Sequence, residues 1–496
     1  MRTEFGKRAV NCEADVAIIG YGPAGATLAN LLGQSGISTL VLEREEAAYH
    51  LPRAVHFDDE VMRVFDTIGL AEAIEQMVHV SPGMRFIDAA GRCLLEWPRP
   101  KERTPQGWHA SYRFHQPELE CILRQGLKRF PSVSVRTRIE ALAVDEDADG
   151  ETIRCENLRT GVLERIRARY VVGCDGARSF IRRKIGETPD EMGFNEHWLV
   201  VDVLLNRPKP ELGDFSIQYC NTARSATYVR GTGNRRRWEI ALHDDEDYAD
   251  LVRPERVWAL LAPWVSPDEA TLERAACYRF QSLVARPWRL GRLLLAGDAA
   301  HQTPPFLGQG MCAGIRDVAN LAWKLARVLR GKDDDALLDS YESERAPHVR
   351  EYIALAVRLG GLINTKAMEA ALPDGCRLGD PATMESIRPE LGPGLAAGWT
   401  GLPRQVAPQP VLSDGRRLDA HVGYAPALLL RNDVALPPNE AAKLAERDVV
   451  VVRDPAPALQ DWLADLGVVA VAVRPDRYML GAARDATELV TLAHRI

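Results

Sequence analysis

The sequence predicts an α/β protein in which an antiparallel β-sheet is inserted into a larger α/β domain and a smaller α/β domain follows. Three observations favour this fold class. They are a strand–helix–strand pattern over residues 15–43, closely spaced strand-like segments over 195–285, and apolar segments alternating with helical ones near the C-terminus. A chain of 496 residues is also too long for one compact core, so two or three domains are expected.

The first element is a βαβ unit. Residues 15–20 (DVAIIG) form a continuous apolar run that ends at glycine, which is typical of a buried strand. A helix is expected over residues 24–34, where Gly36 can end it, and a second strand over 38–43. The crossover between the two parallel strands should be right-handed.

A glycine motif joins this strand to this helix. Gly20 permits the tight turn, Gly22 lets backbone approach a pyrophosphate, and Gly25 lets helix and strand pack closely. Glu43 ends the second strand, where a carboxylate can accept hydrogen bonds from a ribose diol. The context predicts a Rossmann-like dinucleotide site. The residues expected to contact the cofactor here are Gly20, Gly22, Pro23, Ala24, Gly25, Glu43 and Arg44.

Two later segments, residues 170–176 and 292–298, are apolar runs that we expect to return to the same sheet. Between them, segments at 198–204, 215–220, 227–230 and 238–242 predict an inserted antiparallel sheet. The predicted limits are 1–194 with 286–373 for the larger domain and 195–285 for the sheet, and a helix is expected over 313–329.

Proline and glycine become frequent over residues 374–409, which predicts a linker. Apolar segments at 427–430, 449–452 and 468–473 then alternate with helical segments at 439–446 and 456–466. This alternation predicts a small α/β domain over 410–496.

Composition limits the partners. A formal net charge of −7 argues against nucleic acid or an anionic membrane as the main partner. The nine cysteines contain no C-x-x-C pair, so we expect no disulfide framework and no bound metal. Neither a secretory signal nor a run of ~18 apolar residues is visible, which favours a cytoplasmic protein without a membrane span.

Two further motifs carry a family resemblance. Residues 174–182 (CDGARSFIR) contain D-G-x-x-S-x-x-R, and residues 297–311 run from GDAAH through two prolines to GQGM. With the first glycine motif, they resemble the three motifs of class A flavin monooxygenases, the single-component FAD-dependent aromatic hydroxylases that include 4-hydroxybenzoate hydroxylase. The resemblance covers much of residues 15–330.

The resemblance implies a cofactor and a reaction. It implies an FAD-binding domain, a substrate-binding sheet, NADH or NADPH as a transient co-substrate, and O2. In this class NAD(P)H reduces FAD, oxygen adds at flavin C4a, and the hydroperoxide passes an oxygen atom to the aromatic ring. Besides the first motif, the residues that the resemblance assigns to the cofactor are Arg53, Gln116, Asp175, Asp298, Pro305, Gly308, Gly310 and Met311.

Longer stretches at 52–60, 218–224, 234–240 and 308–317 are similar to the 3-(3-hydroxyphenyl)propionate hydroxylases. This subgroup ortho-hydroxylates a phenol that bears a short carboxylate chain. Cys312 replaces the asparagine of the wider class. On this basis we expect His56, Tyr219 and Pro304 to be catalytic, and Gln218, Arg224 and Tyr228 to bind substrate, with Arg224 on the carboxylate.

The C-terminal part resembles the thioredoxin-like appendix of phenol hydroxylase relatives. It has no cysteine after Cys376, which excludes dithiol redox chemistry there, so a structural role or homodimer contacts are expected. Two alternatives to a phenolic-acid hydroxylase stay open at this point. One is a hydroxylase of a polycyclic or polyketide phenol, and the other is a non-enzymatic flavin-binding sensor.

Overall fold

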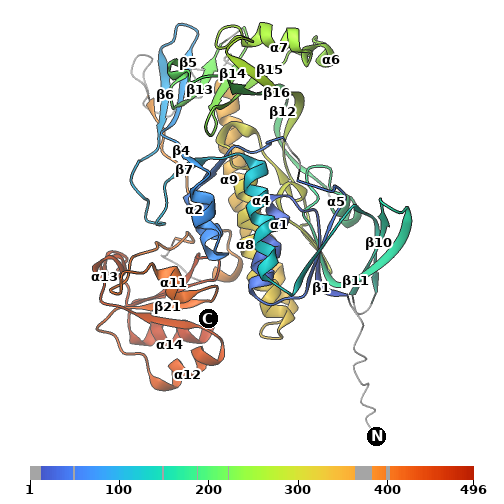
Figure 1. The fold of residues 1–496 in the computed structure, drawn as a ribbon. Coiled ribbons are helices and arrows are strands. Elements are labelled where there is room, and N and C mark those ends of the chain that lie inside the picture. The colour runs from blue at the N-terminus through green and yellow to red at the C-terminus, as the bar shows by residue number, and fades with distance from the viewer. Residues whose placement is uncertain are drawn as a thin grey trace.

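The computed structural model describes residues 13–48, 51–147, 150–186, 188–221, 223–363, 382–397 and 403–496. Figure 1 shows a central α/β domain, a large sheet at one end of it, and a small α/β domain packed against its side. The α/β fold class and the sheet-bearing insertion are thereby confirmed. Residues 1–12 and 364–373 of the predicted first domain, and 374–381 and 398–402 of the predicted linker, lie outside the described residues.

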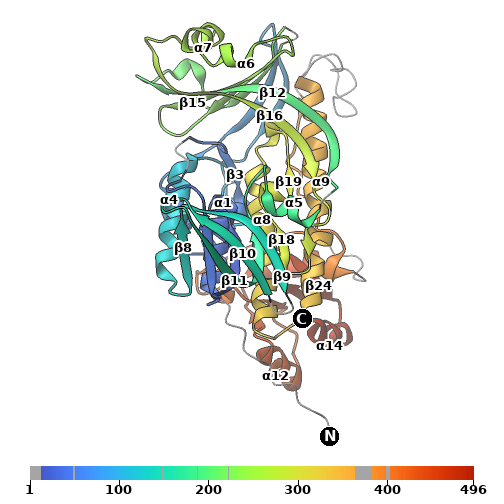
Figure 2. The same ribbon diagram turned by 90° about the vertical axis from the view of Figure 1, so that its right-hand side faces the viewer.

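The central sheet has the strand order β17-β18-β11-β1-β2-β8, in which β18, β11, β1, β2 and β8 are parallel. A hairpin of β9 and β10 extends β11 on one side (Figure 2). Apolar runs form the strands because both faces of a parallel sheet are covered. The strands are β1 (Ala14–Ile19), β2 (Thr39–Glu43), β8 (Val133–Thr137), β9 (Ile139–Asp147), β10 (Gly150–Asn157), β11 (Val162–Gly173), β17 (Arg289–Leu290) and β18 (Leu293–Leu295).

Long helices pack beside this sheet. α1 (Pro23–Gln34) approaches α8 (Gly310–Leu329) closely because small residues meet where they cross. A Cβ on Gly314 of α8 would lie 3.6 Å from the Cβ of Ala24 on α1, and 2.9 Å from the Cα of Gly297 in the third motif. The remaining helices of this region are α2 (Asp59–Thr67), α3 (Ala71–Glu75), α4 (Gln116–Gly126), α5 (Phe180–Ile185) and α9 (Ser340–Ile363).

The second sheet has the order β19-β16-β12-β15-β14-β13-β5-β6-β20 and is mostly antiparallel. It extends beyond residues 195–285, because the β5–β6 hairpin adds to β13 and a strand from the predicted linker adds to β6. α6 (Tyr248–Leu251) and α7 (Pro254–Leu261) lie at its outer side (Figure 1). Its strands are β5 (Gly83–Asp88), β6 (Cys93–Pro98), β12 (Asp190–Leu205), β13 (Ser216–Cys220), β14 (Ala226–Arg230), β15 (Arg235–Ala241), β16 (Ala270–Val284), β19 (His301–Gln302) and β20 (Ala382–Thr383).

A three-stranded sheet, β3-β7-β4, connects the two regions. It is formed by β3 (His56–Asp58), β4 (His79–Val80) and β7 (Ser111–Arg113). His56 pairs directly with Arg113 across β3 and β7, so both side chains project from the same face.

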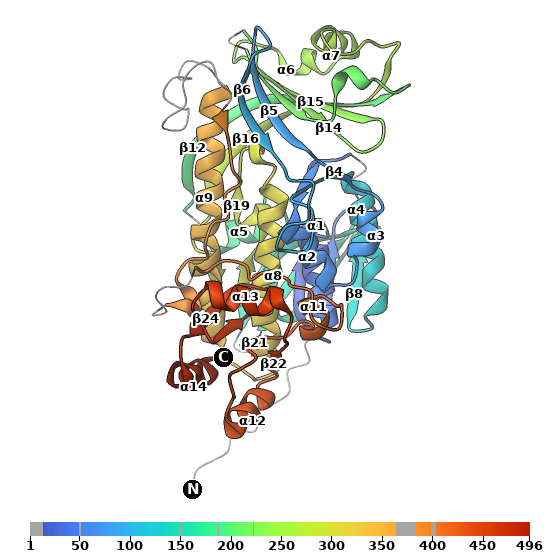
Figure 3. The same cartoon turned by 90° about the vertical axis from the view of Figure 1, so that its left-hand side faces the viewer.

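The C-terminal domain packs beside α2 and α8 (Figure 3). Its sheet has the order β22-β21-β23-β24, with β21 parallel to β22 and antiparallel to β23. The connectivity β–α–β–α–β–β–α is compatible with a thioredoxin-like fold, which stays a prediction. The elements are β21 (Ala427–Leu430), β22 (Val450–Arg453), β23 (Ala470–Val473), β24 (Met479–Ala483), α11 (Leu418–Val422), α12 (Pro438–Glu446), α13 (Pro457–Asp465) and α14 (Ala486–Arg495).

In the described part of the chain, no helix has the length and apolar character needed to cross a membrane.

Candidate flavin site and substrate cavity

The three sequence motifs meet at the carboxyl edge of the central sheet. Backbone hydrogen bonds join them, from Cys174 N to Ile19 O at 2.8 Å and from Ala296 N to Gly173 O at 3.0 Å. Gly20 has φ +104°, and a Cβ there would lie 2.3 Å from the carbonyl oxygen of Cys174. The first two motifs therefore pack backbone against backbone, which only glycine permits at this position.

The turn into α1 fits a phosphate group. A Cβ on Gly25 would lie 2.1 Å from the oxygen of Gly20, whereas a Cβ on Gly22 would meet no heavy atom within 4 Å. The helix has no side-chain cap and no acidic residue in its first turn. Its amide groups and its dipole are therefore available to an anion. Pro23 and Ala24 are half-buried in this turn.

Glu43 lies at the end of β2, as predicted for a ribose-binding carboxylate. Its two oxygens accept hydrogen bonds from Tyr21 N at 2.8 Å and Glu45 N at 2.9 Å. These bonds orient the carboxylate and leave further lone pairs on both oxygens. Arg44 is exposed and pairs with Glu45 at 3.2 Å, so the structure does not direct it into the site.

Asp298 follows β18, beside the first two motifs. Its side chain is exposed, yet protein surrounds it closely enough to raise the pKa of its carboxyl group through desolvation. Among the described residues none donates a hydrogen bond to this carboxylate. A flavin ribityl hydroxyl would supply such a donor, so the residues present fit FAD.

Gln116 positions the loop that carries Arg53. Its amide oxygen accepts hydrogen bonds from Arg53 N at 2.9 Å and Ala54 N at 2.7 Å, while Arg237 donates to the carbonyl of Arg53 at 2.7 Å. The Arg53 side chain is exposed and lies close enough to Asp298 to lower the pKa of that carboxyl group in part. Gln116 thus positions the loop of Arg53, and its direct contact with the cofactor stays a prediction.

The carboxylate of Asp175 is engaged within the protein. It accepts hydrogen bonds from Ser179 Oγ at 2.5 Å, Phe180 N at 2.6 Å and Ile181 N at 3.2 Å, which fixes the start of α5. From α5, Arg182 donates to the carbonyl of Asp298 at 3.2 Å. Asp175 therefore orients the second motif against the third, and Arg182, the last residue of the second motif, makes the connection.

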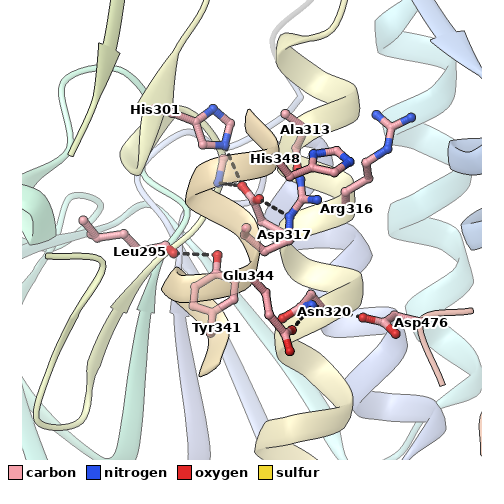
Figure 4. Close-up of polar contacts among 12 residues, drawn as sticks. Leu295, His301, Ala313, Arg316, Asp317, Asn320, Tyr341, Glu344, His348 and Asp476 are labelled. Atoms are coloured by element: carbon pink, nitrogen blue, oxygen red, sulfur yellow. Dashed lines mark hydrogen bonds and ion pairs between the residues drawn. The ribbon is translucent and has the colours of Figure 1, made fainter. Parts of the chain in front are cut away.

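A buried ionic cluster holds the third motif in place (Figure 4). Asp317 on α8 accepts hydrogen bonds from Gly297 N at 3.1 Å and from Arg345 Nε at 3.0 Å, and its Oδ2 lies 2.6 Å from His301 Nε2. Burial alone would raise the pKa of Asp317, but His301 and Arg345 outweigh it and lower that pKa. Asp317 was not selected from the sequence either.

A cavity lies between the third motif and the second sheet and opens to solvent; the space in it, open solvent included, is about 570 Å³. The residues that line it are Val55, His56, Ser81, Gly83, Met84, Trp97, Arg99, Ser111, Arg113, Ser216, Thr227, Val229, Glu239, Pro305, Phe306, Leu307 and Gly308. Pro305 and Gly308 are thus shared between the predicted flavin site and this cavity. Gly310 and Met311 begin α8 directly behind them.

His56 is buried in the cavity wall, and its Nδ1 lies 3.3 Å from the carbonyl oxygen of Gly308. Since a carbonyl only accepts, this contact places the proton on Nδ1 and leaves Nε2 as an acceptor. Burial, together with the charge of Arg113, lowers the pKa of His56 to about 3, so the ring is neutral near pH 7.

Two of the predicted ring contacts lie on the face of the sheet away from this cavity, because side chains alternate along a strand. Ser216 on β13 and Thr227 on β14 face the cavity, whereas Tyr219 and Tyr228 face the opposite side. There Tyr219 packs 5.1 Å from the ring of Trp264 and Tyr228 packs against Trp238. Both tyrosines belong to the core beneath α7.

The other predicted substrate residues also lie off the cavity. Gln218 is fully buried, with its amide bound to Thr227 Oγ1 at 2.6 Å and to the carbonyl of Ala226. Arg224 pairs with Glu246 at 2.6 Å, which occupies its guanidinium. Pro304 is buried behind Pro305 and does not line the cavity.

Sequence reasoning missed Arg99, Arg113 and Glu239. Arg99 directly follows β6, which reaches this sheet through the pairing of β5 with β13, and Arg113 lies on β7 of the connecting sheet. Glu239 lies inside the predicted range and inside the stretch 234–240, but neither feature assigned it a role.

Comparisons with known proteins agree with this geometry. Residues 13–356 match the family described as FAD binding domain, and residues 395–495 match the HcaD C-terminal domain. A Rhodococcus jostii (strain RHA1) protein named "Probable NADH-specific resorcinol 4-hydroxylase" is 37% identical over 517 residues, which cover 99% of this chain and 95% of the relative.

A Mycobacterium avium (strain 104) protein named 3-(3-hydroxy-phenyl)propionate/3-hydroxycinnamic acid hydroxylase is 39% identical, over 72% of this chain but only 63% of the relative. Among solved structures, an aklavinone-11 hydroxylase complex with FAD and aklavinone has a TM-score of 0.78 at 23% identity, covering 98% of this chain and 99% of that one. At that identity, the structural likeness supports the fold alone.

Proposed function

The chain belongs to the FAD binding domain family and is an FAD-dependent aromatic hydroxylase, and we propose that it hydroxylates a single-ring phenol with NADH as the reductant. The observation that carries this proposal is the cavity, because Pro305 and Gly308 belong both to its wall and to the third flavin motif. An aromatic ring held there would lie next to the cofactor.

FAD, when bound, would accept a hydride from NADH and activate dioxygen. The protein's own residues would bind and orient it. The start of α1 would hold the pyrophosphate, Glu43 the adenosine ribose, and Asp298 the ribityl chain. Arg53, on the loop fixed by Gln116, would stabilise negative charge nearby.

On the substrate side, the neutral His56 would orient the phenol. Nε2 would accept a hydrogen bond from the phenol hydroxyl, which makes the ring oxygen, and hence the ortho carbon, more electron-rich. The apolar side chains of Met84, Trp97 and Phe306 would pack on the ring and exclude water from the reacting atoms.

The names of the relatives point to two kinds of small phenol. One name specifies resorcinol, which is neutral, and the other specifies phenols with a carboxylate side chain. We propose the second kind, of which 3-(3-hydroxyphenyl)propionate is the reference compound. A homodimer and a cytoplasmic location stay predictions.

The test is NADH oxidation by the flavin-loaded protein with and without each phenol, combined with chromatography of the products. We expect stimulated oxidation and one catechol or hydroxyquinol per NADH. Oxidation that yields only hydrogen peroxide would contradict hydroxylation of that compound. A response to polycyclic phenols alone would replace the single-ring proposal.

A further inference from the structure

Two arginines line the cavity with few partners of their own. Arg113 donates from Nη2 to Ser216 Oγ at 2.9 Å, and its buried Nε has no partner in the described structure. Arg99 stacks over the ring of Trp97 at 4.0 Å, and the described residues provide its guanidinium with no hydrogen bond or ion pair. Both guanidinium groups therefore retain donors for a ligand in the cavity.

Nearby carboxylates are already committed to other cations. Asp202 pairs with Arg237 at 2.7 Å and with Arg274 at 2.8 Å, and Glu239 lies 3.8 Å from Arg237. These two carboxylates are matched by those two guanidinium groups. The charge of Glu239 also reaches Arg113, where it partly offsets the lowering of the arginine's pKa by burial.

The carboxylates next to Arg99 are committed in the same way. Asp58 and Glu60 share Arg316, each at 2.6 Å, and Asp59 pairs with Arg388 at 2.7 Å. Among the described residues, no carboxylate lies within ion-pair distance of Arg99 or Arg113. Burial lowers the pKa of each to about 10, and the charge of Arg99 contributes to this at Arg113, so both remain protonated at neutral pH.

We propose that Arg99 and Arg113 form an anion subsite that binds a carboxylate on the substrate, so that a phenolic acid binds better than a neutral phenol. The proposal rests on the hydroxylase function proposed above. A planar guanidinium can donate two parallel hydrogen bonds to a carboxylate, and such charge-assisted bonds strengthen in a cavity of low dielectric.

The location suits such a substrate. His56 and Arg113 are direct partners across β3 and β7, so their Cβ atoms are separated by about 5 Å. A molecule with one ring and a short acidic chain can reach both. The subsite takes the role that the sequence analysis assigned to Arg224, whose guanidinium is occupied by Glu246.

The experiment compares three substrates in the holoenzyme: 3-(3-hydroxyphenyl)propionate, its methyl ester, and resorcinol. In Arg113→Gln and Arg99→Gln, we expect KM for the acid to rise about 10- to 100-fold, as for loss of a charged hydrogen bond. KM for the ester and for resorcinol should change less than about threefold. Arg85→Gln is the matched control, because Arg85 lies on β5 of the same sheet but is exposed.

Flavin content and melting temperature of each variant separate misfolding from lost binding. Equal rises of KM for acid and ester, or a wild-type protein that uses the ester as well as the acid, would overturn the subsite while leaving hydroxylation intact. If no phenol stimulates NADH oxidation, calorimetric titration with the acid still tests the subsite. Binding by wild type that is lost in Arg113→Gln supports it, and equal binding overturns it.

Discussion

Two regions of the molecule bury arginines, and they treat the charge in opposite ways. At the C-terminal domain, Arg63 pairs with Asp419 at 2.7 Å, and Arg474 pairs with Glu344 at 2.9 Å and with Asp476. In the cavity, the described residues place no carboxylate within ion-pair distance of Arg99 or Arg113, although the charge of Glu239 reaches Arg113. In the first region the buried charges stabilise the fold, whereas in the cavity the guanidinium groups remain available to bind a ligand.

The paired region extends from the C-terminal domain towards the flavin motifs. In Figure 4, Asn320 on α8 lies between Glu344 and Asp476, with hydrogen bonds of 2.9 Å and 3.1 Å. Tyr478 donates to Glu60 at 2.7 Å, and Glu60 pairs with Arg316 beside Asp58. Buried charges without partners would be costly, so this domain supplies part of the interior of its neighbour.

The largest effect is expected where a paired arginine is removed. Arg474→Met leaves Asp476 without its ion-pair partner and Glu344 with Lys324 as its remaining cation, and should lower the free energy of unfolding by about 3–5 kcal/mol. Urea unfolding followed by circular dichroism measures it. The control is Arg431→Met, which breaks an exposed pair with Asp433 and should leave the midpoint unchanged. Equal urea midpoints for the two variants would contradict the expected difference between a buried and an exposed ion pair.

Acid should weaken the paired region next. Although burial opposes it, the charges of Arg474 and Lys324 lower the pKa of Glu344 to about 2 in the folded protein, below an ordinary value near 4.5. Its stabilising contribution is therefore complete above about pH 4.5 and is lost as pH falls towards 2. Glu344→Gln should flatten this part of the stability profile. A variant whose unfolding midpoint follows pH as steeply as wild type would refute the assignment.

A smaller effect on stability is expected in the cavity. Arg113→Met removes a buried charge that has no carboxylate partner, so the free energy of unfolding should change by less than about 1 kcal/mol or even rise. This variant should nevertheless bind the phenolic acid poorly. Thermal melting beside substrate titration tests both at once, and a loss as large as that in Arg474→Met would place Arg113 among the structural arginines.

The smallest effect should come from Arg224→Gln. This partly exposed arginine pairs with Glu246, so its loss should cost at most about 1 kcal/mol and should leave KM for the acid within about twofold. Steady-state kinetics with the acid and its methyl ester measure these KM values. A rise of KM for the acid alone would assign the substrate carboxylate to Arg224 and contradict the comparison between the two regions.

Local patterns predicted much of this fold. The first strand, helix and strand lie within one residue of the predicted limits, because a glycine turn between an apolar strand and a helix restricts the backbone strongly. Of the apolar segments of the C-terminal domain, 427–430 coincides with β21, and 449–452 and 468–473 overlap β22 and β23. The periodicity of apolar residues is sufficient to predict an element when the residues that form it are neighbours in both sequence and space.

The substrate side was harder to predict, for two physical reasons. Tyr219 and Tyr228 were placed on the correct strands but on the wrong face, because alternation does not say which face meets the cavity. Arg99 depends on the pairing of β5 with β13, and Arg113 on β7 meets Ser216 of β13, so both contacts join segments more than a hundred residues apart. No local signal carries that information.

The contacts of Arg474, Asp476 and Tyr478 also bear on how the protein is made. These residues follow the flavin motifs by more than 150 positions, yet they complete the surroundings of α8, the helix that begins at the third flavin motif. Until a ribosome has synthesised residue 478, those surroundings are incomplete. Stable capture of the cofactor should therefore wait for the C-terminal domain, and a chain truncated before residue 474 should emerge without bound flavin.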